Sequence, residues 1–158
     1  MEITFISGGQ TGIDRGMLDA CLELDFPCGG WCPEERLAED GPIDAKYPLE
    51  VLPGAGYPER TRENVLDTDG TIILFREELT GGTKSSQKLA RSRRKPYLLL
   101  DLEQLELEEA AETSSEMIFE KGLWRINISG PRASEWPESH QLAFQFTSKL
   151  IAKVRGED

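Results

Sequence analysis

The chain has 158 residues, a net charge of −11 at pH 7, 38% hydrophobic residues and 30% charged residues. This length and composition predict one soluble domain over residues 1–158 with a core of its own. Neutralising phosphates requires an excess of Lys and Arg, so the acidic balance argues against nucleic acid as a partner. No stretch reaches the roughly 18 apolar residues of a membrane span, so no membrane partner is expected either.

Three cysteines, Cys21, Cys28 and Cys32, form an odd number without a disulfide framework, which is typical of a reducing compartment. The chain also begins directly with a strand-like segment, without a charged and then apolar leader. A cytoplasmic protein is therefore expected. Cys28 and Cys32 lack a second pair or a nearby His for a zinc site, so we expect core thiols.

The first half of the chain opens with an apolar run at 3–6, which predicts a strand. Spacings of four, four and three then predict one apolar face of a helix, formed by Ile13, Met17, Cys21 and Leu24. A short second strand is expected in "PCGGW". Residues 32–58 hold five of the nine prolines and show no clear period. So long an irregular segment is expected either to close over a ligand or to be an ordered surface excursion.

The second half of the chain alternates in the same way. "GTIILF" (70–75) and "PYLLLD" (96–101) are unbroken apolar runs, as in parallel strands that are covered on both faces. "DLEQLELEEAAETSSEMIFE" (101–120) carries eight acids and predicts a solvated helix face. "WRINIS" (124–129) predicts a last strand, and 138–154 a closing helix. The expected fold is a three-layer α/β sandwich with a mostly parallel sheet of about five strands.

A glycine-rich loop follows the first predicted strand, in "SGGQTGIDRG" from Ser7 to Gly16. Glycine lets the backbone adopt a positive φ and lets a ligand approach without a Cβ atom in the way. Gly8, Gly9 and Gly12 therefore indicate a binding loop. A merely tight turn is the alternative, because the pattern is neither G-x-G-x-x-G nor a P-loop.

The helix after this loop offers free N–H groups and the positive end of its dipole to an anion. Thr11 and Asp14 have the spacing of a capping box, so Thr11 is expected to cap the helix. Arg15 would add a positive charge near the ligand.

Two further strand ends carry loops of the same chemistry. After 70–75 comes "REELTGGTKSS", a Gly-Gly pair flanked by Thr80 and Thr83. After "RINI" comes "SGPRASEWP", with Gly130 and Arg132. Ligands of open α/β sheets bind outside the carboxyl ends of the strands. The three loops together predict a site for a phosphorylated or otherwise anionic small molecule.

Arg60 and Asn64 lie four residues apart in "YPERTRENV", on one face of a helix that begins just after Pro58. They are expected to contact the ligand, or one of them to pair with a neighbouring acid.

Six of the 18 basic residues fall between Lys84 and Lys95. Their dense part suits the negative end of a helix dipole, and only Lys84 lies near the predicted site. His140, the only histidine, is expected to cap the last helix or to face solvent.

An ordered set of motifs resembles the putative molybdenum carrier family: "SGGQTGIDRG", "GGWCP", "AEDGPI", "YPERTRENV", "DGTIILF", "LTGGT", "KPYLLLD" and "NISGPR", followed by "WP". The resemblance runs from Ser7 to about Pro137. That family is similar to the Rossmann-like group that contains the lysine-decarboxylase-like or Lonely Guy phosphoribohydrolases. The resemblance implies a Rossmann-like fold, a homo-oligomer, and a ligand that is either the molybdenum cofactor (molybdopterin) or a nucleotide.

Carried over by motif, the resemblance implies two ligand loops. The first consists of Gly8, Gly9, Gln10, Thr11 and Gly12, with Asp14 and Arg15 beside it, and the second of Thr80, Gly81, Gly82 and Thr83. The phosphoribohydrolases follow their Gly-Gly pair with a glycine, a threonine and then a catalytic glutamate. Residues 83–88 of this chain hold no acid, which favours binding or carriage without turnover.

The alternative is an enzyme that cleaves the N-glycosidic bond of a nucleotide. Such cleavage passes through an oxocarbenium-like state and requires a carboxylate near the ribose. Asp14, Glu39, Asp40 and Asp44 are the candidates for that carboxylate.

Overall fold

The structure is a computed structural model that describes residues 2–157. Its central sheet has five strands in the order β2-β1-β9-β7-β8, and all neighbours pair in parallel. The strands are β1 (Thr4–Ile6), β2 (Cys28–Gly29), β7 (Gly70–Phe75), β8 (Tyr97–Asp101) and β9 (Arg125–Ser129). The predicted strands of the sheet are confirmed, and "PCGGW" contains both β2 and the start of a further short strand.

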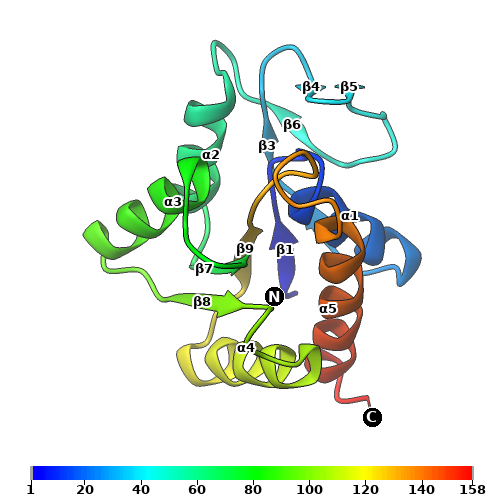
Figure 1. The fold of residues 1–158 in the computed structure, drawn as a ribbon, viewed down its shortest axis with the longest axis vertical. Coiled ribbons are helices and arrows are strands. Elements are labelled where there is room, and N and C mark those ends of the chain that lie inside the picture. Colours follow the sequence, from blue (N-terminus) through cyan, green and yellow to red (C-terminus); the bar gives the residue numbers. More distant parts are fainter. Residues whose placement is uncertain (1, 158) are drawn as a thin grey trace.

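Five helices cover the two faces of this sheet, which confirms the predicted three-layer, Rossmann-like α/β fold (Figure 1). On one face α1 (Ile13–Glu23) and α4 (Leu107–Lys121) both pack against α5 (Ser139–Val154). On the other face α2 (Tyr57–Leu66) packs against α3 (Gly81–Ser92).

The core forms where the sequence periods predict it. Residues 71–74 of β7 are fully buried, as an unbroken apolar strand between two helical layers requires. Met17 and Cys21 of α1 are buried against α5. Gly16 allows that approach, because a Cβ atom there would meet the carbonyl oxygen of His140.

The order of the strands creates a crevice at one edge of the sheet. The last strand, β9, lies in the centre between β1 and β7. The loop after β9 leads to α5 on one face, whereas the loop after β7 leads to α3 on the other (Figure 1). Loops that diverge in this way leave space between them at the carboxyl ends of the strands, where open α/β sheets bind ligands.

The irregular segment 32–58 is an ordered excursion beyond the carboxyl end of β1 (Figure 1). It contains two small sheets, in which β3 (Trp31–Cys32) pairs with β6 (Glu50–Val51) and β4 (Leu37–Ala38) forms a hairpin with β5 (Gly41–Pro42).

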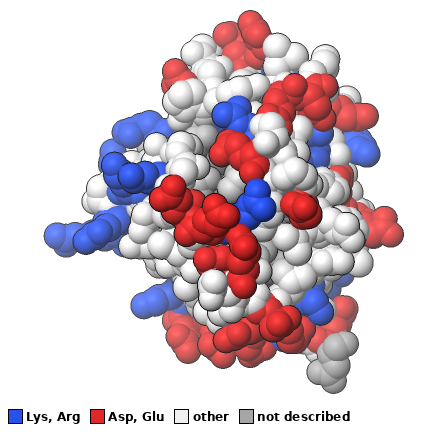
Figure 2. All heavy atoms as spheres, viewed as in Figure 1, with Lys and Arg blue, Asp and Glu red and all other residues white. Residues whose placement is uncertain are grey.

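Charge is distributed unevenly over the surface (Figure 2). Lys and Arg gather on the side where α3 lies, and Asp and Glu gather along the edge formed by α4. The acids of 103–120 are all exposed, which confirms the solvated helix face. Among the described helices, none combines the length and the apolar character that crossing a membrane requires.

Candidate functional site

A cavity of about 570 Å³ lies in the crevice between α2, α3 and the loop after β9. The part of its lining formed by Gln10 and Asp14, which are 7% and 3% exposed, is called the inner end below. The lining residues are Gln10, Asp14, Tyr57, Pro58, Arg60, Thr61, Arg62, Thr80, Gly81, Gly82, Thr83, Ser85, Ser86, Leu89, Ser129, Gly130, Pro131, Arg132 and Glu135.

The glycines of the first loop make room for protein atoms. A Cβ atom on Gly8 would meet the guanidinium of Arg60, and one on Gly9 would meet the side chain of Leu49. A Cβ atom on Gly12 would meet the carbonyl oxygen of Pro131. All three positions are therefore explained by close packing within the chain, and none of the three residues lines the cavity.

The carboxylate of Asp14 binds the backbone N–H groups of this loop. Its Oδ2 accepts hydrogen bonds from the N–H of Gln10 and from Nη1 of Arg60, both at 3.2 Å. Burial raises the pKa of Asp14, although Arg60 and the N–H groups of Gln10 and Gly8 act in the opposite direction. An anion of the protein thus already occupies this loop.

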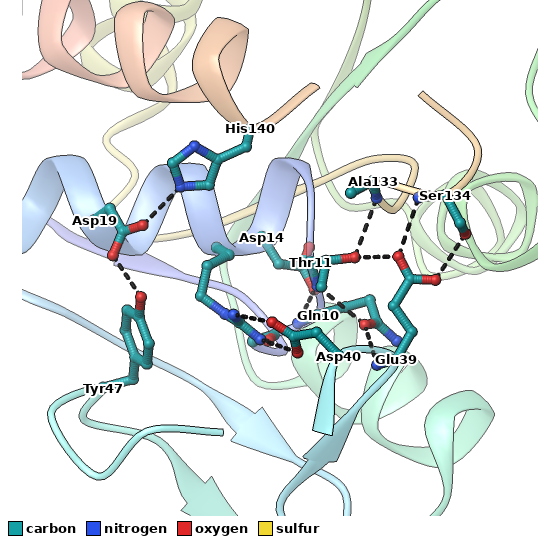
Figure 3. A network of polar contacts seen from close by, with 12 residues as sticks. Gln10, Thr11, Asp14, Asp19, Glu39, Asp40, Tyr47, Ala133, Ser134 and His140 are labelled. Atoms are coloured by element: carbon teal, nitrogen blue, oxygen red, sulfur yellow. Dashed lines mark hydrogen bonds and ion pairs between the residues drawn. The ribbon is translucent and has the colours of Figure 1, made fainter. Parts of the chain in front are cut away.

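The prediction that Thr11 caps α1 is wrong. The N-cap residue is Gly12, and no side chain makes the cap hydrogen bond. The hydroxyl of Thr11 instead donates to Glu39 and accepts the N–H of Ala133 at 3.1 Å (Figure 3). Since the N–H of Ile13 donates to Pro131 at 3.3 Å, the start of α1 is covered by protein.

The N-terminus of α3, in contrast, opens into the cavity. Thr80 is its N-cap residue, with extended backbone and no side-chain cap, and the first turn contains no acid. The first N–H groups of a helix have no intrahelical partner, and together with the helix dipole they attract an anion. Gly81 and Gly82 line the cavity, so these N–H groups are accessible to a ligand.

Arg60 supplies a nearly buried positive charge to the same cavity. Its side chain is 11% exposed and forms an ion pair with Asp14 at 3.2 Å. Its Nε is buried and has no hydrogen-bond partner within residues 2–157. A guanidinium has five N–H donors, and within residues 2–157 only Nη1 of Arg60 has a hydrogen-bond partner, Asp14.

A cluster around Glu39 joins the β4–β5 hairpin to the loop after β9 (Figure 3). Its carboxylate accepts from the hydroxyl of Thr11, from the N–H of Ser134 at 3.0 Å and from the hydroxyl of Ser134 at 2.7 Å. Desolvation acts to raise the pKa of Glu39, but these hydrogen bonds together hold it below its usual value. The hairpin therefore braces two of the three predicted loops without lining the cavity.

The structure brings nine of the sixteen predicted site residues to the cavity: Gln10, Asp14, Arg60, Thr80, Gly81, Gly82, Thr83, Gly130 and Arg132. The other seven do not line it: Gly8, Gly9, Thr11, Gly12, Arg15, Asn64 and Lys84. Arg132 is partly neutralised, because its Nε donates to Glu135 at 2.8 Å.

Arg15 and Asn64 have structural partners. Arg15 donates to Asp40 at 3.0 Å and to the carbonyl oxygen of Gly9. Asn64 is 2% exposed and bonds both the N–H and the carbonyl of Trp31, at 2.9 and 3.0 Å, which ties α2 to β3. Of the two residues on that helix face, Arg60 pairs with an acid and reaches the cavity, and Asn64 does neither.

Several lining residues escaped the sequence analysis, notably Tyr57, Thr61, Arg62 and Ser129. Tyr57 lies three residues before Arg60, on the same helix face, but it was missed because α2 begins at Tyr57 and not after Pro58. Ser129 ends β9 and has a buried hydroxyl without a partner in the described chain. A signal for it was present, because it is the first residue of "SGPRASEWP".

His140 and the cysteines lie outside this site. Nε2 of His140 is 2.6 Å from Oδ2 of Asp19, whose other oxygen accepts from the hydroxyl of Tyr47 at 2.6 Å (Figure 3). The three cysteines are free thiols, and Cys21 and Cys32 are buried. Within residues 2–157, no three His, Cys, Asp or Glu side chains are placed to hold a metal ion.

Comparison with known proteins identifies relatives over nearly all of the chain. A model of the "Circularly permutated YpsA SLOG family" matches residues 5–151. A crystal structure from Syntrophus aciditrophicus, named "Putative molybdenum carrier protein", is similar with a TM-score of 0.92 and 38% identity, over 96% of each chain. Among curated proteins, none matches the chain.

The strand order agrees with this family description. If β9 and α5 stood first in the chain, the sheet order β2-β1-β9-β7-β8 would become 3-2-1-4-5, the order of a doubly wound dinucleotide-binding sheet. The loop after β9 would then follow the first strand, which is where such sheets place their phosphate-binding turn.

Proposed function

Because the chain belongs to the circularly permutated YpsA SLOG family, we propose that it binds a phosphorylated small molecule in the cavity between α2, α3 and the loop after β9. The observation that carries this proposal is the open N-terminus of α3, which shares the cavity with the nearly buried guanidinium of Arg60. A phosphate at α3 would accept from free N–H groups and interact favourably with the helix dipole.

The proposed ligand is the molybdenum cofactor or a nucleotide. Each joins a flat polar heterocycle to a phosphate group, and a cavity of about 570 Å³ is within the usual range for a ligand of that size. No Cys or His is among the described residues that line the cavity. For a molybdenum cargo, the chain would therefore hold the phosphate and the heterocycle, and the ligand itself would hold the metal.

The phosphate position is tested by a substitution in the first turn of α3. A Cβ atom on Gly82 would meet only Thr61, at 3.8 Å and beyond, so Gly82→Asp is expected to fold. Its carboxylate favours the helix but repels a phosphate. We expect at least a tenfold loss of affinity for nucleoside monophosphates by calorimetry, whereas the neutral, similarly sized Gly82→Asn should retain most of it. Equal affinity of the two variants would place the phosphate elsewhere.

Carriage is tested by native mass spectrometry of protein purified from a molybdate-fed host. A carrier must bind tightly enough to protect its cargo, so some ligand should survive purification. A molybdopterin would show pterin fluorescence after oxidation together with molybdenum, and a nucleotide would show a purine mass without metal. If the host makes the cofactor, none co-purifies and added cofactor does not bind, the carrier function is excluded.

Nucleotide cleavage is a second candidate, supported by the position of Asp14. Of the four carboxylates considered for this reaction, only Asp14 lines the cavity. It lies beside Arg60 and is almost fully buried, a setting in which carboxylates take part in acid–base chemistry. Incubation with nucleoside monophosphates, followed by chromatography of the free base, separates the two candidates. Rapid base release that Asp14→Asn abolishes would establish the enzyme, whereas intact nucleotide together with binding by calorimetry would support the binder.

The proposal extends to a homo-oligomer, which the family resemblance implies, and to the cytoplasm, which the three free cysteines favour. Sedimentation equilibrium at several protein concentrations tests the assembly, and a monomer at every concentration would count against it.

A further inference from the structure

The carboxamide of Gln10 is held in one orientation. Its Oε1 accepts the N–H of Thr11 at 3.0 Å and the N–H of Glu39 at 2.9 Å (Figure 3). The reversed amide would place its NH₂ group against these two donors, so the network assigns the oxygen to this side. Its Nε2 is then the free end, and it makes no hydrogen bond within residues 2–157.

This free amide nitrogen belongs to the inner end of the cavity, because Gln10 lines the cavity and is 7% exposed. On two other lining residues, Nε of Arg60 and the hydroxyl of Ser129 are buried without partners in the described chain. Amide and guanidinium nitrogens can only donate. Since buried donors are normally paired, this end of the cavity is suited to a ligand atom that accepts.

The ligand atom that accepts at this end of the cavity is expected to be a neutral oxygen and not a phosphate oxygen. The carboxylate of Asp14 lies at the same end, where its Oδ2 binds both the N–H of Gln10 and Arg60. It would repel a phosphate dianion and already offsets the guanidinium charge. The start of α3 has no acid in its first turn, so the phosphate belongs there.

Gln10 and Asp14 line the same cavity, and together they offer it one donor and one acceptor. The Nε2 of Gln10 donates, and the carboxylate of Asp14 accepts. A heterocycle with a carbonyl next to a ring N–H presents the complementary pair, as 6-oxopurines and 4-oxopterins do. Adenine presents the reverse, an amino group next to a ring nitrogen that accepts. Resting on the phosphate site proposed above, we infer that the ligand is a phosphorylated oxo-heterocycle and that Gln10 selects its carbonyl group.

Glu39 supports this selection as a positioning residue. Its own N–H holds Oε1 of Gln10, and its carboxylate fixes Thr11 and Ser134. The β4–β5 hairpin therefore sets the direction of the amide without touching the ligand.

The test compares IMP with AMP by isothermal titration calorimetry on the full chain. The two nucleotides share ribose and phosphate and differ only at the purine edge that Gln10 would recognise. The wild-type protein should bind IMP at least tenfold more tightly than AMP. In Gln10→Glu the acceptor for the two backbone N–H groups is kept, but the donor becomes a carboxylate oxygen, so the preference for IMP should be lost or reversed.

Matched controls separate the possible outcomes. Gln104→Glu makes the same change at an exposed glutamine that does not line the cavity, and it should leave the IMP-to-AMP ratio unchanged. Thermal unfolding checks that Gln10→Glu is folded. Gln10→Met removes the donor without adding charge, and it should bind IMP and AMP with similar affinity. If the wild-type protein binds both nucleotides equally, with both sensitive to Gly82→Asp, this inference is overturned and the proposed function stands. If neither nucleotide binds and added molybdenum cofactor does not bind either, the proposed function fails and this inference fails with it.

Discussion

For single residues, a comparison of Gly9 with Gly54 separates two reasons for a glycine, which are a positive φ and close packing. Gly9 has φ +80° and faces Leu49, so both its backbone and its missing side chain are required. Gly54 has φ +74° but nothing within 4 Å of a Cβ position. The two glycines share the backbone requirement, and only Gly9 has the packing requirement.

Replacing each of these glycines by alanine should separate the two costs. The left-handed backbone alone costs about 1–2 kcal/mol, which is the loss expected for Gly54→Ala. Gly9→Ala should lose about 2–4 kcal/mol, because Leu49 must also move. Urea unfolding followed by circular dichroism measures both free energies of unfolding. Equal losses would show that Gly9 is not packed against the 32–58 segment.

The raised pKa of Asp14 makes its contribution to the free energy of unfolding fall as the pH rises, whereas the contribution of most acids increases. Burial raises its folded pKa, so its protonated form is favoured in the folded state. Its stabilising contribution is complete below its unfolded pKa of about 3.9 and is lost as the pH rises through the raised folded value. Relative to Asp14→Asn, the wild-type protein should therefore lose free energy of unfolding as the pH rises above about 4.

Asp40 provides the matched control for this pH dependence. The hydrogen bond from Arg15 lowers its pKa, so its contribution is present above the unfolded value and is lost as the pH falls through the lowered folded one. Relative to Asp40→Asn, the wild-type protein should therefore gain stability as the pH rises towards 4. Urea unfolding across the pH range measures both differences, and parallel curves for Asp14→Asn and the wild-type protein would contradict the burial of an ionisable Asp14.

Among the elements, the last residue of the basic run at 84–95 contacts a neighbouring helix. The dense part of this run is predicted to suit the negative end of the dipole of α3, and Arg91 does lie in the last turn of that helix. Lys95 instead extends its Nζ to the end of α2, where it donates to the carbonyl oxygens of Val65 at 3.2 Å, Leu66 at 2.6 Å and Thr68 at 2.6 Å. One side chain thus satisfies the last carbonyl groups of the helix that carries Arg60.

Lys95→Met should destabilise the protein by about 1–2 kcal/mol, because it removes charge-assisted hydrogen bonds at a helix C-terminus and keeps a long apolar stem. Lys88→Met is the control, since Lys88 is exposed and forms no ion pair in the described chain. It should change the free energy of unfolding by less than about 0.5 kcal/mol. Denaturant titrations of the two variants decide, and equal effects would rule out the capping role of Lys95.

At the scale of the whole molecule, the strand order allows the ends of the chain to be moved. Residues 2 and 3 line the same surface hollow as residues 154 and 155, so the two ends of the described chain lie close together. α4 ends at Gly122, which has φ +63° and open space around it. An exposed turn of this kind tolerates new termini.

A circular permutant that joins the natural ends by a short Gly/Ser linker and opens between Lys121 and Gly122 should fold. Its order of strands along the chain would be that of a doubly wound sheet, with β9 first. Far-UV circular dichroism and a cooperative urea transition like those of the natural chain are expected. A second permutant, opened between Ile72 and Ile73 inside the buried strand β7, should not fold. Failure of the first permutant would show that its natural connectivity is required for folding.

Local patterns in the sequence are sufficient to predict most helices and strands of this protein. The apolar run at 70–75 and the spacing of Ile13, Met17 and Cys21 are local patterns, and burial between two layers or against one layer imposes them directly on the chain. The three loops at strand ends were recognisable for the same reason, since Gly-Gly pairs and an Arg after a strand are local features.

Which of these residues share a site depends on contacts that form only in the tertiary structure. The central place of β9 depends on pairing with β1 and β7, strands that lie far away in the sequence. Thr11 does not cap α1 because its hydroxyl binds Glu39 of the hairpin and Ala133 of the loop after β9. Gly9 faces Leu49 and Gln10 faces the cavity because the 32–58 segment packs on one side of their loop. Such contacts join residues distant in sequence, and no local pattern records them.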